Sequence, residues 1–357
     1  FGSSSWLAQV FCECLLCKMA DVPGLLVLGL NPAWQTILRL RNLDLGQVNR
    51  AEAAQPGVGG KGQNAAKAAA TYAAASAEFG IVVAQFLGGV TGQQIQTHLK
   101  GLSIADISAD TGVATRQTVT LLDYNSDPNK PTVTELITPS ESIKASVVAD
   151  LQTQLIAEAP KHKGILMMGT WPSGATGEMY AATAKAKADG ALVLMDAFKP
   201  PGDVSAILAE GHVDMYKVNA FEMCTIMGSE GLKEGEVTPD QVKDAVTRAF
   251  DKFTGVKYFA ITDGPGNAYL FSREPRQAVR YEIPKVTCLN PIGAGDTVAG
   301  VTMAAFCSGS TPSMQEAMHF GLAAASAKVQ NESEGGVFVP ETMQAMKERI
   351  ICKPLEW

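Results

Sequence analysis

Residues 290–297 read Asn-Pro-Ile-Gly-Ala-Gly-Asp-Thr and lead directly into an apolar run with helical character, residues 298–306. Gly293, Ala294 and Gly295 are small enough for consecutive backbone N–H groups to turn inward and form an anion-binding concavity, to which the following helix adds its positive N-terminal end. Asp296 stands at the mouth of this concavity, placed to take a proton from a hydroxyl. A glycine loop with an Asp helix cap would give the same pattern, so the stretch alone is only suggestive.

A second glycine motif lies upstream, where residues 57–67 read Gly-Val-Gly-Gly-Lys-Gly-Gln-Asn-Ala-Ala-Lys. It matches G-x-G-x-x-G, but residues 49–56 are polar, rich in alanine and end in proline, so they predict a poor core strand and argue against a dinucleotide site. Lys61 is followed by Gly62 instead of Ser or Thr, which excludes a Walker P-loop. Two interpretations remain: a loop that lets a ligand lie against the backbone, with Asn64 hydrogen-bonding to it, and a plain helix N-terminus.

The two motifs together resemble the N-terminal and C-terminal signatures of the PfkB, or ribokinase-like, carbohydrate kinases, in the family's order and at a separation of roughly 230 residues. Four more segments match the same family: Asn31-Pro32-Ala33, Thr115-Arg116, residues 169–174 and residues 217–222. Within the family these segments resemble the 1-phosphofructokinase and tagatose-6-phosphate kinase branch. The resemblance covers about residues 24–345, nearly the whole chain.

Apolar runs alternate with helical patterns along the chain, which predicts an α/β fold. The strand candidates are residues 25–30, 81–87, 164–168, 191–196, 213–218 and 257–262, and the helix candidates are residues 61–77, 140–159, 174–189, 241–253 and 312–330. The resemblance implies a ribokinase-like three-layer α/β/α fold with a mostly parallel central sheet and a small β-sheet lid. We assign the lid to segments of about 36–58 and 112–138, the second of which reads as a hairpin of residues 117–123 and 132–138.

One kinase domain is expected over residues 21–352, and residues 1–20 are interpreted as a tail or leader outside the fold. The apolar part of this leader is too short to span a membrane and lacks the basic region of a secretory signal. The net charge of −7 argues against a nucleic-acid partner. No other segment has transmembrane length, and a cytoplasmic location is expected, with organellar targeting by the N-terminal segment left open.

The residues expected at the substrate follow from the resemblance. Gln35 stands where the family usually has Asp, so it can accept and donate hydrogen bonds but carries no charge. Arg116 resembles the residue that holds the phosphate already present on the substrate, although a lone Arg on a strand is more often a surface residue. The full set of substrate-binding residues is Gln35, Gly59, Gly60, Lys61, Asn64, Arg116 and Thr170.

Asn219 and Glu222 have N-x-x-E spacing at a strand end, where amide and carboxylate oxygens one turn apart suit Mg²⁺. A helix cap followed by a first-turn Glu explains the same spacing equally well. The resemblance favours the metal site and implies that ATP is bound by Lys217, Asn219, Thr262, Gly264, Gly266, Ala324 and Asn331.

The resemblance implies an ATP- and Mg²⁺-dependent kinase that phosphorylates a hydroxyl of a sugar phosphate, such as fructose 1-phosphate, fructose 6-phosphate or tagatose 6-phosphate. Asp296 is the expected base, and the Gly293, Ala294, Gly295 and Asp296 amides are the expected anion hole. The expected partners are the sugar phosphate, ATP and a second copy of the chain bound through the lid. Two alternatives stay open: a kinase for a free sugar or a nucleoside on the same fold, and a weakly active sensor that binds a sugar phosphate.

Overall fold

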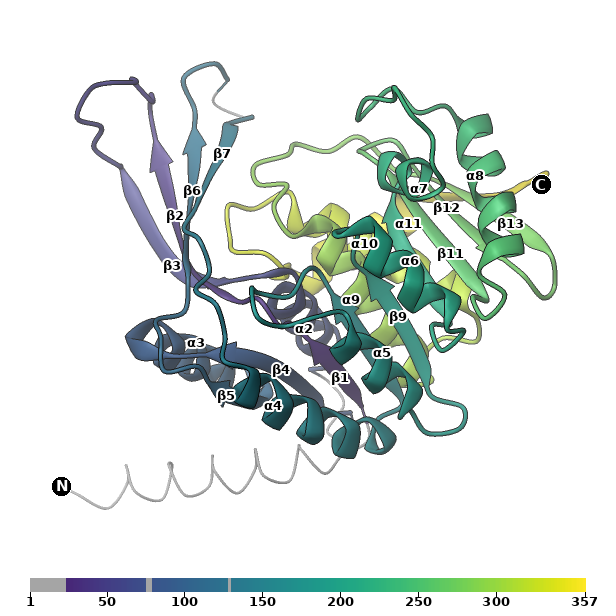
Figure 1. Ribbon diagram of the computed structural model, residues 1–357. Helices are drawn as coiled ribbons and strands as arrows, with labels where there is room; N and C mark the ends of the chain where they lie inside the picture. Colours follow the sequence, from purple (N-terminus) through teal and green to yellow (C-terminus); the bar gives the residue numbers. More distant parts are fainter. Residues whose placement is uncertain (1–23, 75–78, 128–129) are drawn as a thin grey trace.

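The computed structural model describes residues 24–74, 79–127 and 130–357, and the predicted leader, residues 1–20, lies outside them. The chain forms a ten-stranded sheet with helices on both faces and a separate four-stranded sheet that projects from one side of this body (Figure 1). The arrangement confirms the expected α/β/α fold with a mostly parallel central sheet and a smaller second sheet.

The main sheet has the strand order β14-β13-β12-β11-β10-β9-β8-β1-β4-β5. Its strands are β1 (Leu25–Leu28), β4 (Ile81–Leu87), β5 (Ala105–Asp110), β8 (Gly164–Met168), β9 (Leu192–Asp196), β10 (Met215–Asn219), β11 (Tyr258–Asp263), β12 (Asn267–Ser272), β13 (Gln277–Glu282) and β14 (Ile351–Leu355). The strands from β5 to β11 in this order pair in parallel, and β12, β13 and β14 complete one edge with antiparallel pairs. All six predicted strands are present, whereas β5 and the three antiparallel strands were not predicted.

Two helical layers cover the sheet because its buried strands are apolar on both faces. Leu26 and Leu28 of β1 join one core and Leu25 and Val27 join the other. The first core packs against α4 (Ala145–Glu158), the short 3₁₀ turn η1 (Ala159–Lys161), α5 (Glu178–Lys185), α6 (Pro201–Ala209), α7 (Ala220–Ile226) and α8 (Pro239–Lys252). The second packs against α2 (Lys61–Ala73), α3 (Gly89–Gly101), α9 (Ala294–Cys307), α10 (Met314–Lys328) and α11 (Pro340–Arg349).

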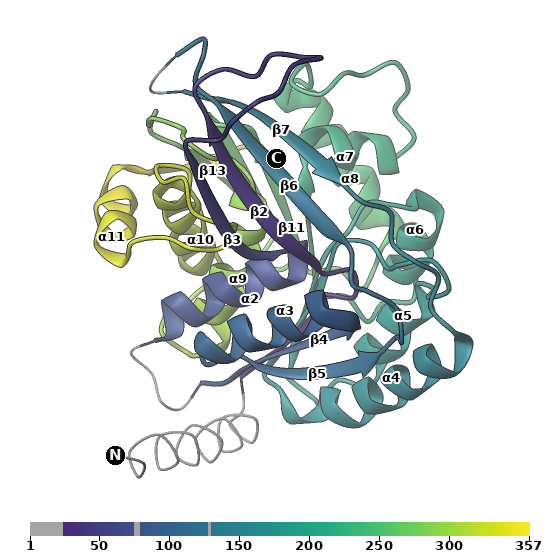
Figure 2. The ribbon, with the colours of Figure 1, turned by 90° about the vertical axis from the view of Figure 1, so that its left-hand side faces the viewer.

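The segments predicted to be the lid form the small sheet, for which we keep that name, with the order β3-β2-β6-β7 (Figure 2). Its strands are β2 (Ala33–Leu40), β3 (Ala53–Gly59), β6 (Gln117–Asp123) and β7 (Thr132–Ile137), so β2 begins three residues before the predicted segment. The predicted hairpin of β6 and β7 is present. The residues before the glycine motif form β3, which includes the first glycines of the motif, but β3 is an edge strand of the small sheet and its first four residues are exposed. The absence of a core strand there still argues against a dinucleotide site.

The direction of chain winding reverses at β1, which lies between β4 and β8. In open α/β sheets the ligand site lies at the carboxyl ends of the strands on either side of such a reversal. The segments that follow β1, β8 and β9 are therefore the expected place for a site.

The chain remains part of the fold beyond residue 352, the predicted end of the domain. Strand β14 continues to Leu355, and the Trp357 ring lies 5.2 Å from the rings of both Phe250 and Phe271. Within the described ranges, no helix is both long enough and apolar enough to cross a bilayer.

Candidate active site

A cavity of about 290 Å³ opens at the carboxyl ends of β1, β8 and β9, the place that the topology predicts. It brings together segments that lie far apart in the sequence, including the predicted residues Lys61, Arg116, Thr170 and Glu222. Its lining consists of Gly29, Asn31, Lys61, Gly62, Gln63, Arg116, Met168, Gly169, Thr170, Phe198, Lys199 and Glu222. Gln35, Asn64 and Asp296 do not line this cavity.

Glycines allow helix α2 to begin directly against the end of β1. A Cβ at Gly62 would lie 2.2 Å from Gly29 Cα, so only glycine fits there. Gly60 precedes the helix with a φ of 113°, a conformation that side chains rarely adopt. The predicted sugar loop, residues 57–60, leads into this close contact between α2 and β1 and places Lys61 at the first position of α2.

Asp196, at the end of β9, organises the cations beside the cavity and was missed by sequence reasoning. Its Oδ1 lies 2.9 Å from Lys61 Nζ and its Oδ2 lies 2.6 Å from Lys217 Nζ. Burial opposes ionisation, but the two ammonium groups lower the pKa of Asp196 to about 2. Lys217 is therefore paired with Asp196 and buried, whereas Lys61 also faces the cavity.

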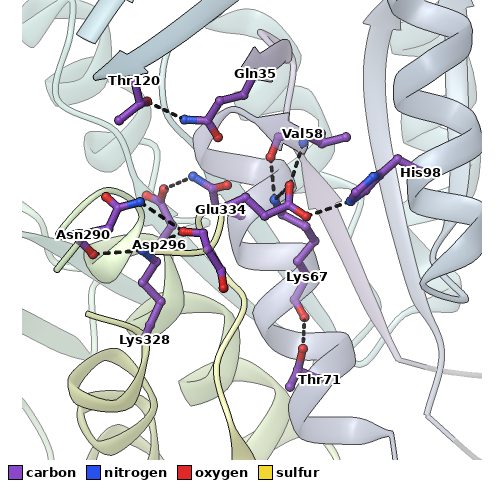
Figure 3. Close-up of polar contacts among 12 residues, drawn as sticks. Gln35, Val58, Lys67, Thr71, His98, Thr120, Asn290, Asp296, Lys328 and Glu334 are labelled. Atoms are coloured by element: carbon purple, nitrogen blue, oxygen red, sulfur yellow. Dashed lines mark hydrogen bonds and ion pairs between the residues drawn. The ribbon is translucent and has the colours of Figure 1, made fainter. Parts of the chain in front are cut away.

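Asp296 is buried in the first turn of α9, with 7% of its surface exposed. Its Oδ2 accepts a hydrogen bond of 2.9 Å from Asn64 Nδ2 on α2, so the two sequence motifs meet directly (Figure 3). Burial raises the pKa of Asp296, and the nearby ammonium of Lys61 opposes this rise. A buried carboxylate of increased basicity is what a general base requires.

The loop before Asp296 turns sharply into α9, and one of the amides predicted for the anion hole is already used. Gly293 has a φ of 79° and directly precedes α9, so the loop turns sharply into the helix. The Ala294 amide donates to the Pro291 carbonyl at 3.1 Å and is used inside the loop. The Gly295 and Asp296 amides lie in the first turn, where no intrahelical acceptor exists, and they are the donors that can face an anion.

Gln35 extends from the lid with an unpaired acceptor. Its Nε2 donates to Thr120 Oγ1 at 2.8 Å, and its buried Oε1 has no hydrogen-bond partner within the described structure. Asn64 Oδ1 is buried and unpaired in the same way. A buried acceptor without a partner is costly, so both oxygens are suited to accept hydrogen bonds from the hydroxyl groups of a ligand.

Arg116 lies at the cavity wall, but part of its guanidinium is already used. Its Nε donates to the Pro32 carbonyl at 3.1 Å and its Nη2 to the Asn31 carbonyl at 2.8 Å. These bonds occupy one edge of the planar group, so a phosphate would meet the Nη1–Nη2 edge. Burial lowers the pKa of Arg116, which is consistent with its position at the wall.

Asn219 and Glu222 form the helix cap that was the alternative to a metal site. The Asn219 side chain accepts from the Glu222 amide at 2.8 Å, and Glu222 Oε2 accepts from the Asn219 amide at 3.0 Å. Glu222 nevertheless lines the cavity. The described ranges contain no group of three or more His, Cys, Asp or Glu side chains arranged for a metal ion. Mg²⁺ is often held by one carboxylate with water and phosphate oxygens, and Glu222 fits that mode.

The other residues predicted to contact ATP lie in β11, in the turn after it, in α10 and in the loop after α10. Thr262 is the penultimate residue of β11, and Gly264 and Gly266 lie in the hairpin turn to β12. Ala324 lies within α10 on its buried face and presents no surface to a ligand. Asn331 shapes its own loop, since its Oδ1 accepts from the Ser333 amide at 3.0 Å.

Comparison with known proteins relates this geometry to a family. The model of the pfkB family carbohydrate kinases matches residues 33–341. A tagatose-6-phosphate kinase from Staphylococcus epidermidis is 24% identical over 283 residues, which cover 78% of this chain and 84% of the relative.

Solved structures share the fold at low sequence identity. Phosphofructokinase-2 from Escherichia coli, in complex with substrates and products, superposes with a TM-score of 0.78 at 20% identity, covering 92% of this chain and 99% of that one. Arabidopsis thaliana ribokinase, complexed with ribose and ATP, superposes with a TM-score of 0.68 at 19% identity and the same coverages. Both motifs meet in a fold that these kinases share, and the family model spans most of the sequence; the chain therefore belongs to the pfkB family of carbohydrate kinases.

Proposed function

We propose that this carbohydrate kinase transfers the γ-phosphoryl group of ATP to a hydroxyl of a sugar phosphate, of the class of fructose 1-phosphate, fructose 6-phosphate or tagatose 6-phosphate. The observation that carries the proposal is that Arg116 faces the cavity with a guanidinium edge that its bonds to two main-chain carbonyls leave open. Lys61, which also lines the cavity, is already paired with Asp196, whereas the Arg116 guanidinium is bonded to carbonyl oxygens. An acceptor with its own phosphate would give Arg116 an anionic partner, which a free sugar would not. The tagatose-6-phosphate kinase relative supports the same choice of substrate class.

In this proposal Asp296 accepts the proton of the attacking hydroxyl, and its raised pKa increases its basicity for that task. The hydroxyl oxygen forms a bond to the γ-phosphorus as the bond to the ADP leaving oxygen breaks. The Gly295 and Asp296 amides and the N-terminal end of α9 stabilise the charge of the transferring group. Lys61, held by Asp196, adds a fixed positive charge beside it.

Gln35 and Asn64 orient the sugar, since each has a buried acceptor oxygen without a partner. Glu222 would hold Mg²⁺. The nucleotide is proposed to bind against Lys217, Asn219 and the turn of Thr262, Gly264 and Gly266. When bound, Mg²⁺ neutralises charge on the ATP phosphates. The hydroxyl groups of the sugar meet Gln35 instead of a carboxylate, so recognition there is by hydrogen bonds alone.

The partner predicted for the lid is a second copy of the chain. Leu136 and Ile137 of β7 are 55% and 57% exposed, and a homodimer formed through the lid would cover such apolar side chains. The cytoplasmic location stays a prediction.

The test is an ATP-consumption screen over fructose 1-phosphate, fructose 6-phosphate, tagatose 6-phosphate, the corresponding free sugars and nucleosides, with products identified by phosphorus NMR. We expect turnover with a phosphorylated sugar and a decrease of about 10²–10⁴ in kcat for Asp296→Asn. Faster turnover of a free sugar or a nucleoside would replace the proposal with the first alternative. Tight binding of a sugar phosphate without any turnover would instead support the sensor.

A further inference from the structure

Residues 328–336 run from the last residue of α10 toward α11, contact both halves of the proposed site and have no role in the mechanism above. We call this stretch the linker segment. Figure 3 shows two of its side chains, Lys328 beside Asn290 and Glu334 beside Lys67, Val58 and His98. One end of the segment thus reaches residues 290–296, which lead to Asp296 and which we call the catalytic loop. The other end reaches the sugar loop and the lid.

Lys328 connects the linker segment to the catalytic loop. Its side chain is fully buried, and Nζ donates to the main-chain carbonyls of Asn290 at 2.9 Å and Ser333 at 3.2 Å. Asn290 Nδ2 donates to the same Ser333 carbonyl at 3.0 Å, and Asn290 Oδ1 accepts from the Ile292 amide. The ammonium therefore holds the start of the loop that leads to Asp296.

The backbone of the linker segment also packs against this loop. A Cβ at Gly293 would lie 2.6 Å from Gly335 Cα, and a Cβ at Gly335 would lie 2.4 Å from Asn64 Cγ. Gly335 is thus held between the turn before α9 and the side chain that hydrogen-bonds Asp296. A shift of the linker segment would move both.

Glu334 connects the linker segment to the sugar loop. Its Oε2 accepts from the Val58 amide at 2.6 Å and from Lys67 Nζ at 2.7 Å, and its Oε1 lies 2.8 Å from His98 Nε2. Val58 directly precedes Gly59 and Gly60 of the sugar loop. The buried carboxylate therefore fixes the point where β3 enters that loop.

Glu332 adds a contact to the lid itself. Its Oε1 accepts from Arg39 Nη1 at 2.6 Å and from the Tyr124 hydroxyl at 2.5 Å. Arg39 belongs to β2, and Tyr124 directly follows β6. The linker segment therefore contacts β2 and the end of β6 through Glu332, and β3 through Glu334.

Burying the ammonium group of Lys328 costs desolvation free energy, which argues that the residue has a specific role at this position. Burial, together with the nearby ammonium of Lys67, lowers the pKa of Lys328 to about 7. Cys288, Asp296 and Glu334 are the other titratable groups that act on it, and each favours the charged form. A methionine in the same place would avoid the desolvation cost, so packing alone does not explain the residue.

We propose that the linker segment is a brace that couples the sugar loop and the lid to the catalytic loop, with Lys328 and Glu334 as positioning residues at its two ends. The kinetic consequences of this proposal rest on the proposed function, but the structural coupling does not. Neither side chain contacts the reacting atoms in this scheme. Each acts by placing a loop that does.

Hydrogen exchange of the full-length chain tests the coupling without requiring activity. We expect Glu334→Gln to speed amide exchange by about tenfold in residues 291–296 as well as in residues 57–60, and Lys328→Met to do the same at both places. Lys328→Gln, which keeps two N–H donors, replaces the methionine variant if that variant does not fold. The remote ion-paired variants Lys187→Met and Glu158→Gln serve as controls. Faster exchange only at the mutated end would overturn the brace.

A kinetic double-mutant cycle then tests its consequence. We expect Glu334→Gln to raise KM for the sugar phosphate and Lys328→Met to lower kcat, each by about tenfold, with KM for ATP nearly unchanged. The fold-change in kcat/KM of the double variant should differ by about threefold or more from the product of the two single fold-changes. When either variant is combined with Lys187→Met, the fold-change should equal that product. Unchanged constants or simple multiplication in an active enzyme would refute the coupling. If the wild-type chain phosphorylates no sugar phosphate, the proposed function fails and the exchange result alone decides the brace.

Discussion

Two aspartates near the cavity have opposite electrostatic environments, and this difference supports the roles proposed for them. Asp196 lies between two ammonium groups that lower its pKa to about 2, so it stays charged and fixes Lys61 and Lys217. Asp296 has one amide partner and a pKa raised by burial. Two carboxylates whose pKa values move apart divide naturally into a fixed counter-charge and a base.

At the scale of one residue, Asp296→Asn should stabilise the protein at neutral pH. Because its folded-state pKa is raised above the unfolded value of about 3.9, the ionised carboxylate reduces stability above that pH. We expect the free energy of unfolding in urea to be higher for Asp296→Asn at pH 7, and the difference to shrink as the pH falls toward 4. The exposed variant Asp189→Asn is the control. A difference that is constant with pH would contradict a raised pKa.

A second prediction at this scale concerns the substrate phosphate. Arg116→Ala should raise KM for the sugar phosphate by the equivalent of about 2–4 kcal/mol, because the phosphate loses a bidentate partner, while KM for ATP stays the same. Arg116→Lys should restore only part of this loss, since an ammonium lacks the planar fork.

Arg273→Ala is a matched control for this prediction, because Arg273 also donates to main-chain carbonyls, those of Val256 and Phe250, but does not line the cavity. It should lower stability and leave KM unchanged. An equal rise in KM for both arginine variants would show that Arg116 acts only through backbone support.

At the scale of elements, the site depends on how closely α2 and α9 approach each other. Ala65, Ala66, Ala68 and Ala69 on α2 are fully buried, and Gly300 on α9 faces Ala65. Small side chains allow this contact, and Asn64 and Asp296 are brought within hydrogen-bonding distance near the N-terminal ends of the same two helices. The alanine-rich composition of α2 thus has a direct consequence for the catalytic geometry.

Gly300→Ala should separate these helices. An added Cβ would lie 2.1 Å from the Ala65 carbonyl oxygen, so we expect a loss of about 1–3 kcal/mol in the free energy of unfolding and a lower kcat, because Asn64 no longer meets Asp296. Urea denaturation and steady-state kinetics measure the two effects. Gly202→Ala in α6, where nothing lies within 4 Å of the new Cβ, should affect neither. Unchanged activity in Gly300→Ala would mean that the helix contact does not control the site.

At the scale of the whole molecule, the lid is attached to the body through few covalent connections and several side chains. The two sheets share no hydrogen-bonded strand pair in the described part of the chain. Arg39 and Val58 attach the lid to the linker segment, and Arg116 attaches it to the end of β1. The position of the lid relative to the cavity therefore depends on tertiary contacts.

The proposed homodimer makes a prediction at this scale. The double variant Leu136→Lys/Ile137→Lys places one charge on each face of β7 and should convert a dimer to a monomer, because a charge at an apolar contact must be desolvated. Light scattering coupled to gel filtration measures the mass. Ile156→Lys, at a 42% exposed position on α4, is the control. A monomeric wild-type protein, or a dimer that survives the double variant, would contradict assembly through the lid.

Much of the site could be predicted because its chemistry is concentrated in short segments. The loop of residues 290–297 and the glycine motif of residues 57–67 contain their own turns and helix starts, so local composition identifies them. The six predicted strands are apolar runs buried on both faces, which gives a strong local signal. The antiparallel strands β12, β13 and β14 were missed because each mixes polar with apolar residues toward one edge of the sheet.

By itself the sequence determined the α/β fold, the order of the two motifs, and Asp296 and Asn64 as candidate residues. Only the tertiary structure showed that Asp296 and Asn64 share a hydrogen bond, that Asp196 pairs with Lys61, and that Glu334 reaches Val58. The physical reason is the length of chain between the partners, which is 135 residues for Lys61 and Asp196 and 276 for Val58 and Glu334. A single Asp or Glu carries no local mark of its partner, because that partner is selected only when packing brings distant segments together.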